Sequence, residues 1–228
     1  MSLNALCHVF QSKWHSAFPG DGHYFCRELY DPSDTSVLLV KDHVYKSDYF
    51  KDRAIYVVRD GRDSMVSLCR FLEPINDWDI TDADGFVDFL VAIAERYLFG
   101  FWSENVRLAV EAQDAGADIR FWRYEDIVRD PSEYLHMAEH IASARIVARD
   151  PSELAAHIER RRLEIDDPQW GYAVDAPDLF ATWSQNRGGS NWRTVFNDRA
   201  RAVFHELGGT EMLLRFGYET DADWWRKD

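Results

Sequence analysis

Basic residues are scarce in this chain, and its cysteines are few and scattered. The 228 residues include 26 Lys and Arg against 40 Asp and Glu, which leaves a net charge of −14. Because most of such a surface repels a polyanion, the balance argues against a protein that coats nucleic acid, although a small anionic ligand can still bind where basic residues gather. The three cysteines, Cys7, Cys26 and Cys69, have no paired spacing, which favours a reducing compartment.

Targeting and membrane signals are also missing. The start of the chain lacks the basic-then-apolar pattern of a signal peptide. The most apolar window, residues 86–94, is followed at once by Glu95 and Arg96 and is too short to span a bilayer. We therefore expect a soluble cytoplasmic protein that binds no membrane. The phosphate-binding patterns G-x-x-x-x-G-K-[ST] and G-x-G-x-x-G are absent as well.

Short apolar segments alternate with helical ones along the chain. Residues 37–40, 54–58 and 119–124 have the composition of buried strands. Their alternation with helices predicts an α/β fold in which helices flank a central parallel sheet. Because 46% of the residues are apolar and nine are Trp, residues 1–228 are expected to form a single well-packed domain.

Helical periodicity begins after residue 60 and recurs over residues 81–113 and 192–207. Two identical Asp-Pro-Ser-Glu tetrads, at residues 130–133 and 150–153, predict further helix starts with Asp as the N-cap. One apolar stripe of the helix at residues 81–113 is expected to face the core: Phe86, Leu90, Ile93, Tyr97 and Phe101.

The segment VVRDGRDSMVS carries the most informative polar residues. Arg59 ends the strand at residues 54–58, a turn follows at Asp60 and Gly61, and Ser67 lies two turns along the next helix. A helix N-terminus at the carboxyl edge of a parallel strand is suited to binding an anion. Arg59 and Ser67 are therefore candidates to hold one phosphate; the alternative is an arginine paired with a nearby acid and a serine that contacts only its own helix.

Lys41 and His43 follow the strand at residues 37–40. In an extended segment, residues two apart point the same way, so both side chains can face one reacting centre. A histidine titrates near neutral pH and suits the role of general base, while the lysine supplies a fixed positive charge. A surface lysine beside a hydrogen-bonded histidine is the alternative.

A long loop without clear period is predicted over residues 164–185, and loops of this length often act as lids. It leads into Arg187, Gly188 and Gly189, so residues 164–190 are expected to form a lid or cofactor loop. The glycines allow the backbone to approach an anion closely, and the arginine offers a planar fork to phosphate oxygens. An ordinary flexible surface loop would show the same residues.

Other candidates are weaker. Tyr124, which precedes Glu125 and Asp126 after a predicted strand, could stack on a base or simply pack in the core. His136 and His140 are four residues apart, but a metal site needs a third ligand. Acidic pairs at residues 77–79 and 82–84 are better explained as solvated helix caps than as a metal–nucleotide site.

The order of these segments resembles the cytosolic-type sulfotransferase family over roughly residues 36–217. The resemblance rests on Lys41-x-His43, on Arg59 and Ser67, on Tyr124-Glu125-Asp126, and on the segment from Arg187 to Arg193. It implies the sulfotransferase fold, which is related to P-loop nucleotide-binding proteins. It also implies sulfuryl transfer from 3′-phosphoadenosine 5′-phosphosulfate (PAPS) to a hydroxyl or amine of a small-molecule or carbohydrate acceptor, with release of PAP and without a metal.

The resemblance assigns roles residue by residue. His43 would be the catalytic base, and Lys41 would stabilise charge on the sulfuryl oxygens. Tyr124 would lie near the adenine. The residues implied for the 3′-phosphate are Arg59, Ser67, Arg187, Gly188 and Gly189.

The chain departs from the family pattern in two places. Gly188 stands where the family usually has a second basic residue, and that loop is shorter. No segment matches the family's first loop, Pro-[Lys/Arg]-Ser-Gly-x-Thr, which cradles the 5′-phosphosulfate; residues 19–22 share only Pro and Gly with it. Either the chain is truncated at its start, which we favour, or another element replaces this loop.

Two alternative functions stay open. A protein that keeps the fold and the 3′-phosphate half-site could bind a nucleotide or a partner without turnover. The absence of a match to the 5′-phosphosulfate loop is the reason for this alternative. A nucleotide-sugar glycosyltransferase that uses the acidic pairs is a weaker alternative, and it predicts dependence on manganese.

Overall fold

The computed structural model of the chain contains two compact units, each assembled from two separate stretches of sequence. Unit 1 comprises Met1–Val57 and Ala112–Asp167, and unit 2 comprises Val58–Glu111 and Pro168–Asp228. A single domain over residues 1–228 stays a prediction. The structure describes residues 14–16, 39–41, 53–76, 81–96, 101–142, 146–147, 149–165 and 191–226.

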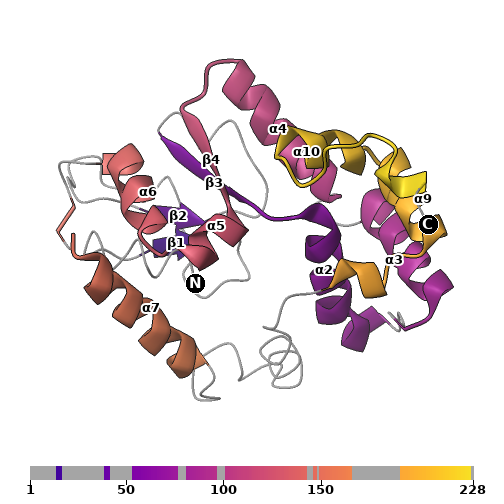
Figure 1. Cartoon of the computed structure of the whole chain (residues 1–228), viewed down its shortest axis with the longest axis horizontal. Coiled ribbons are helices and arrows are strands. Elements are labelled where there is room, and N and C mark those ends of the chain that lie inside the picture. The colour runs from indigo at the N-terminus through magenta and orange to yellow at the C-terminus, as the bar shows by residue number, and fades with distance from the viewer. Residues whose placement is uncertain are drawn as a thin grey trace. The chain divides into compact units, whose positions relative to one another are not determined.

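Unit 1 contains two two-stranded sheets among its described residues (Figure 1). Strands β1 (Trp14–Ser16) and β2 (Leu39–Lys41) pair in parallel, with Trp14 opposite Leu39. Strand β3 (Ala54–Val58) pairs with β4 (Ile119–Arg123). The predicted strands are confirmed to within a residue or two of their observed ends, and the mixed α/β class with parallel pairing is confirmed. Strand β1 was not predicted.

Three helices complete the described part of unit 1: α5 (Tyr124–Arg129), α6 (Glu133–Ala142) and α7 (Pro151–Ile165). Both Asp-Pro-Ser-Glu tetrads begin helices as predicted. The carboxylates of Asp130 and Asp150 accept the backbone N–H of Ser132 (2.9 Å) and Ser152 (2.8 Å). Hydrogen bonds from the side chain and then from the backbone N–H of these serines lower the pKa of both acids. Each acid thereby satisfies an N–H group near a helix N-terminus.

The core of unit 1 joins these helices to the sheet of β3 and β4. Met137 and Leu154, from α6 and α7, are buried together with Ile127 of α5, and Ile55, Val57 and Trp122 of the sheet pack against them. Arg53 contacts the last turn of α6, where its Nη1 donates to the carbonyl oxygen of His140 at 2.9 Å. In unit 1, the strands and helices predicted from local sequence patterns therefore pack against one another in one core.

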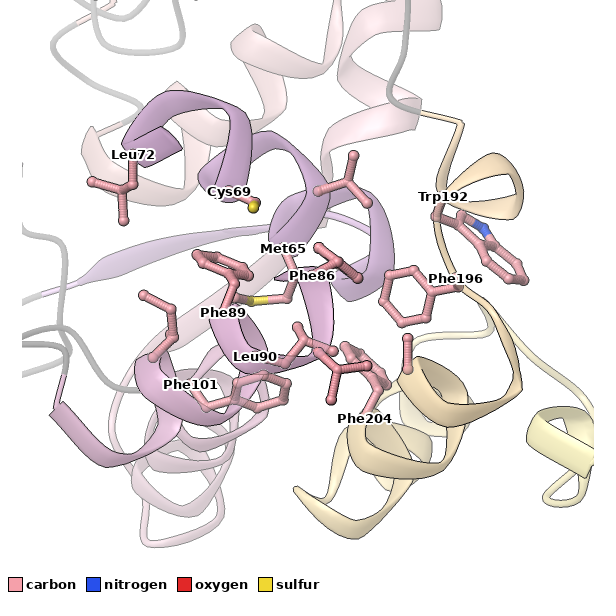
Figure 2. Packing of buried hydrophobic residues seen from close by; sticks show 14 of the residues in the cluster. Met65, Cys69, Leu72, Phe86, Phe89, Leu90, Phe101, Trp192, Phe196 and Phe204 are labelled. Carbon is pink, nitrogen blue, oxygen red and sulfur yellow. The ribbon is translucent and has the colours of Figure 1, made fainter. Parts of the chain in front are cut away.

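Apart from Val58 at the end of β3, the regular elements among the described residues of unit 2 are helices. Its core brings α2 and α3 against α9, and Figure 2 shows Phe86 and Leu90 of α3 facing Phe196 and Phe204. The ring centroids of Phe86 and Phe196 lie 5.1 Å apart in an edge-to-face arrangement. The elements are α2 (Gly61–Asn76), α3 (Ala83–Arg96), α4 (Trp102–Asp114, which runs on into unit 1), η3 (Trp192–Thr194), α9 (Asp198–Glu206), α10 (Gly209–Arg215) and η4 (Trp224–Arg226).

The predicted apolar stripe is confirmed as core at each of its described positions, because Phe86, Leu90, Ile93 and Phe101 are all buried. Tyr97, its remaining member, lies outside the described residues. The single helix predicted over residues 81–113 is wrong, however. Phe101 is not helical, and its carbonyl oxygen accepts the N–H of Asn105 (3.1 Å) as a new helix begins.

The helix predicted over residues 192–207 is also interrupted. The backbone of Asn197 is extended, and its side chain accepts the N–H of Ala200, so α9 starts there with an N-cap. In both places the apolar period continues across the break, so periodicity alone does not detect it. The short helix α10 follows α9, and Gly208 before it adopts a φ of 79°.

The predicted loop at residues 164–185 begins later than expected, because α7 continues to Ile165. The rest of that loop, and of the predicted lid at residues 164–190, lies outside the described residues.

Gly61 is expected to tolerate no side chain. A Cβ placed on it would lie 2.3 Å from Cε3 of Trp102, far inside a normal contact. Gly61→Ala should therefore lower the free energy of unfolding by about 1–3 kcal/mol, measured as a shift in the denaturant midpoint. The double variant Gly61→Ala/Trp102→Leu should lose less than the sum of the two single changes, and additive losses would contradict the predicted clash.

Candidate functional site

The structure describes part of the predicted site. Arg59, Ser67 and Tyr124 have described side chains, and Lys41 is described as the last residue of β2 through its backbone alone. Arg59 and Ser67 belong to unit 2, whereas Lys41 and Tyr124 belong to unit 1. The remaining predicted residues lie outside the described part of the chain: His43, Arg187, Gly188 and Gly189.

Arg59 occupies the predicted junction between a strand and a helix. It directly follows β3, and α2 begins two residues later at Gly61. The carbonyl oxygen of Asp60 accepts the backbone N–H (2.9 Å) and the hydroxyl (3.0 Å) of Ser64, which closes the first turn of α2. The strand, turn and helix inferred from the sequence are therefore confirmed, and Arg59 is half-buried at their meeting point.

Ser67 lies on α2 at the margin of its core-facing side. Met65, Val66 and Cys69 are buried in the core of unit 2, whereas Ser67 is half-buried. A serine at this position is six residues from the start of the helix, within its first two turns. Arg59, in the turn after β3, and Ser67, on α2, thus lie in the same unit.

Arg62 is the central polar side chain of this junction, and it was not predicted. It is 2% exposed. Its Nε donates to Oδ1 of Asp60 (3.0 Å) and its Nη2 to Oδ2 of Asp60 (2.7 Å), while Nη1 pairs with Glu219. Its guanidinium carbon lies 3.9 Å from the ring centroid of Trp192 and 4.8 Å from that of Trp224. These five residues form what we call the Arg62 clasp.

The clasp keeps Arg62 charged although it is buried. Burial by itself lowers the pKa of the guanidinium, but hydrogen bonds and charge from Asp60 and Glu219 outweigh it and raise that pKa above its ordinary value. The two indole faces add favourable contact with the cation. Arg62 is therefore fully engaged by protein groups.

Asp63 ties the same helix to the segment at Trp192. Its Oδ1 accepts the backbone N–H of Trp192 at 3.0 Å. Burial is the largest influence on this acid and raises its pKa, while the Trp192 hydrogen bond and the charges of Arg59 and Arg62 partly oppose the rise. No local sequence pattern predicts these contacts, because Glu219 lies 157 residues after Arg62 and Trp192 lies 129 residues after Asp63.

Tyr124 is the first residue of α5, immediately after β4, so its predicted place after a strand is confirmed. It is half-buried. Of the acids that follow it, Asp126 pairs with Arg129 along the same helix. Both acids stand in the first turn of α5, where negative charge is favourable.

A pocket of about 400 Å³ also lies within unit 1, and its lining includes His136 and His140 but, among the described site residues, not Arg59, Ser67 or Tyr124. Its polar side chains bond mainly to one another and to backbone: Nε of Arg53 lies 3.2 Å from Oδ2 of Asp118, and Nε2 of His140 lies 3.1 Å from the carbonyl oxygen of Ala54. His136 contacts Glu133. In the ranges that the structure describes, no three His, Cys, Asp or Glu side chains gather as metal ligands. None of the helices in those ranges is long and apolar enough to cross a membrane.

Comparison with known proteins identifies one family. Residues 40–139 match the sequence model of the sulfotransferase domain. No curated protein matches the chain. The matched region begins in β2 and ends in α6, and it contains Lys41, His43, Arg59, Ser67 and Tyr124 in the order on which the resemblance rested. The sulfotransferase resemblance is therefore confirmed over residues 40–139, and this match supports a sulfotransferase-type function in general.

Proposed function

We propose that the protein is a PAPS-dependent sulfotransferase that acts on a hydroxyl or amine of a small-molecule or carbohydrate acceptor and releases PAP. The observation that carries this proposal is Arg59, half-buried at the junction of β3 and α2 inside the region that matches the sulfotransferase domain. A strand that ends in arginine and turns into a helix N-terminus suits a phosphate.

In the proposed site the phosphate at the 3′ position of the cofactor binds to Arg59 and to the hydroxyl of Ser67. The positive end of the α2 dipole adds attraction for the same anion. Arg187 and the backbone at Gly188 and Gly189 contribute from their own segment, and Tyr124 lies near the adenine. These residues bind the part of the cofactor that stays unchanged in the reaction.

The chemical step is an in-line transfer. The acceptor oxygen or nitrogen forms a bond to sulfur while the bond from sulfur to the bridging phosphate oxygen breaks, and PAP leaves with that electron pair. His43 removes the acceptor proton, and Lys41 stabilises the charge that develops on the sulfuryl and bridging oxygens. Positioning and charge stabilisation supply most of the acceleration, as in phosphoryl transfer.

The proposal is tested by incubating the protein with PAPS and a panel of phenols, sugars and amines, and by measuring PAP release with and without EDTA. Turnover that persists in EDTA is the expected result. PAP binding without turnover on any acceptor class would favour the non-catalytic alternative. Activity that needs manganese and a nucleotide sugar would favour the glycosyltransferase alternative.

Arg59→Ala is expected to weaken PAP binding, because the phosphate loses a charge-assisted hydrogen-bonding partner. The loss should be about 1.5–3 kcal/mol, or roughly ten- to a hundredfold in Kd, by calorimetric titration. Arg199→Ala is the matched control, since Arg199 is an exposed arginine of the same unit that pairs with Asp84. An unchanged Kd in Arg59→Ala would remove Arg59 from the phosphate site.

His43→Ala should abolish turnover and leave PAP affinity nearly unchanged, because a general base acts on the acceptor and not on the cofactor. A fall of about a hundred- to ten-thousandfold in kcat is expected. His136→Ala, which removes an exposed histidine of α6, serves as the control. Wild-type turnover in His43→Ala would show that another group accepts the proton.

A further inference from the structure

We propose that Arg62 is a positioning residue for the phosphate site: through the Arg62 clasp it fixes the turn that carries Arg59, so that Arg59 meets the phosphate without adjustment. This inference rests on the proposed function, since it concerns the same site. It assigns to Arg62 no contact with the cofactor.

Arg62 holds the side chain of Asp60 in place. The carboxylate of Asp60 receives three hydrogen bonds from Arg62: from the backbone N–H at 2.9 Å, from Nε at 3.0 Å and from Nη2 at 2.7 Å. Asp60 is the residue between Arg59 and the start of α2. Because both oxygens of its side chain are held, the peptide units on either side of Asp60 have little freedom to rotate.

Arg62 is itself bound by residues from a distant part of the chain. Nη1 of Arg62 pairs with Glu219, and Nη2 also donates to the carbonyl oxygen of Tyr218 at 3.3 Å. The hydroxyl of Tyr218 donates to the carbonyl oxygen of Val58 at 3.1 Å, and Val58 is the residue directly before Arg59. Arg59 is therefore flanked on both sides by residues that the segment after α10 holds in place.

This arrangement of Arg62 fixes the direction of its partners more than it stabilises the fold. A buried ion pair is a weak source of stability, because desolvation of the charges offsets much of their attraction. A planar guanidinium with two carboxylate partners and two indole faces instead fixes direction, which a flexible ammonium group cannot do. With both carboxylates and the Tyr218 carbonyl as acceptors, the guanidinium of Arg62 is committed to protein groups.

The test uses Arg62→Lys, which keeps the charge but loses the fork. We expect the Kd for PAP to rise at least about tenfold, as losses in supporting shells commonly do. The KM for PAPS should rise with it while kcat at saturating PAPS stays within about twofold, because binding to the unreactive phosphate is equal in ground and transition states.

Two controls separate positioning from a general loss of stability. Phe101→Leu weakens the core of the same unit at a residue that is not one of the five of the clasp, and it should lower the unfolding midpoint without changing the Kd for PAP. Glu219→Gln removes one carboxylate from the clasp with little change of shape, and it should raise that Kd severalfold even if Arg62→Lys folds poorly. If Phe101→Leu changes the Kd as much as the clasp variants do, Arg62 is merely structural.

The deciding measurement is a double-mutant cycle with Arg59→Ala. If Arg62 acts through Arg59, Arg62→Lys should have little further effect on PAP affinity once Arg59 is alanine. Additive losses would overturn the positioning role, as would an unchanged Kd in Arg62→Lys when the wild-type chain binds PAP. Failure of the wild-type chain to bind PAP would overturn the proposed function itself, and the role of Arg62 with it.

Discussion

The buried guanidinium of Arg62 is the constraint that the candidate site depends on. A cation that is 2% exposed must have its charge and its N–H groups matched by protein groups. One carboxylate comes from Asp60, two residues away, and the other from Glu219, at the far end of the chain. Arg62 therefore joins the turn after β3 to the segment after α10.

The core of unit 2 supplies the rigid support for that turn. Rings of Phe86, Phe196 and Phe204 meet edge to face, with centroids 5.1 to 5.6 Å apart, in a core that also contains Met65 and Cys69 of α2. A site on such a framework can hold Arg59 and Ser67 in a defined geometry without a bound ligand. This arrangement agrees with a sulfotransferase-type site, in which much of the catalysis comes from positioning.

Local patterns predicted the elements on which the functional reading rests. The strand that ends before Arg59, the helix that begins at Gly61 and both helices started by Asp-Pro-Ser-Glu follow from composition, turn residues and capping. The breaks at Phe101 and Asn197 were not predicted, because the apolar period continues across both of them. At each break the structure shows a new helix start: the carbonyl oxygen of Phe101 accepts the N–H of Asn105, and the side chain of Asn197 accepts the N–H of Ala200.

By itself, the sequence determined the α/β class, the junction around Arg59 and the sulfotransferase resemblance, since these depend on residues close together in the chain or on the order of short motifs. Only the tertiary structure decided that Arg62 is buried and which groups neutralise it. A local reading sees an arginine among acids in a polar turn and expects it to face solvent. Its partners at Trp192, Glu219 and Trp224 become neighbours through folding alone, because their contacts span more than a hundred residues of chain.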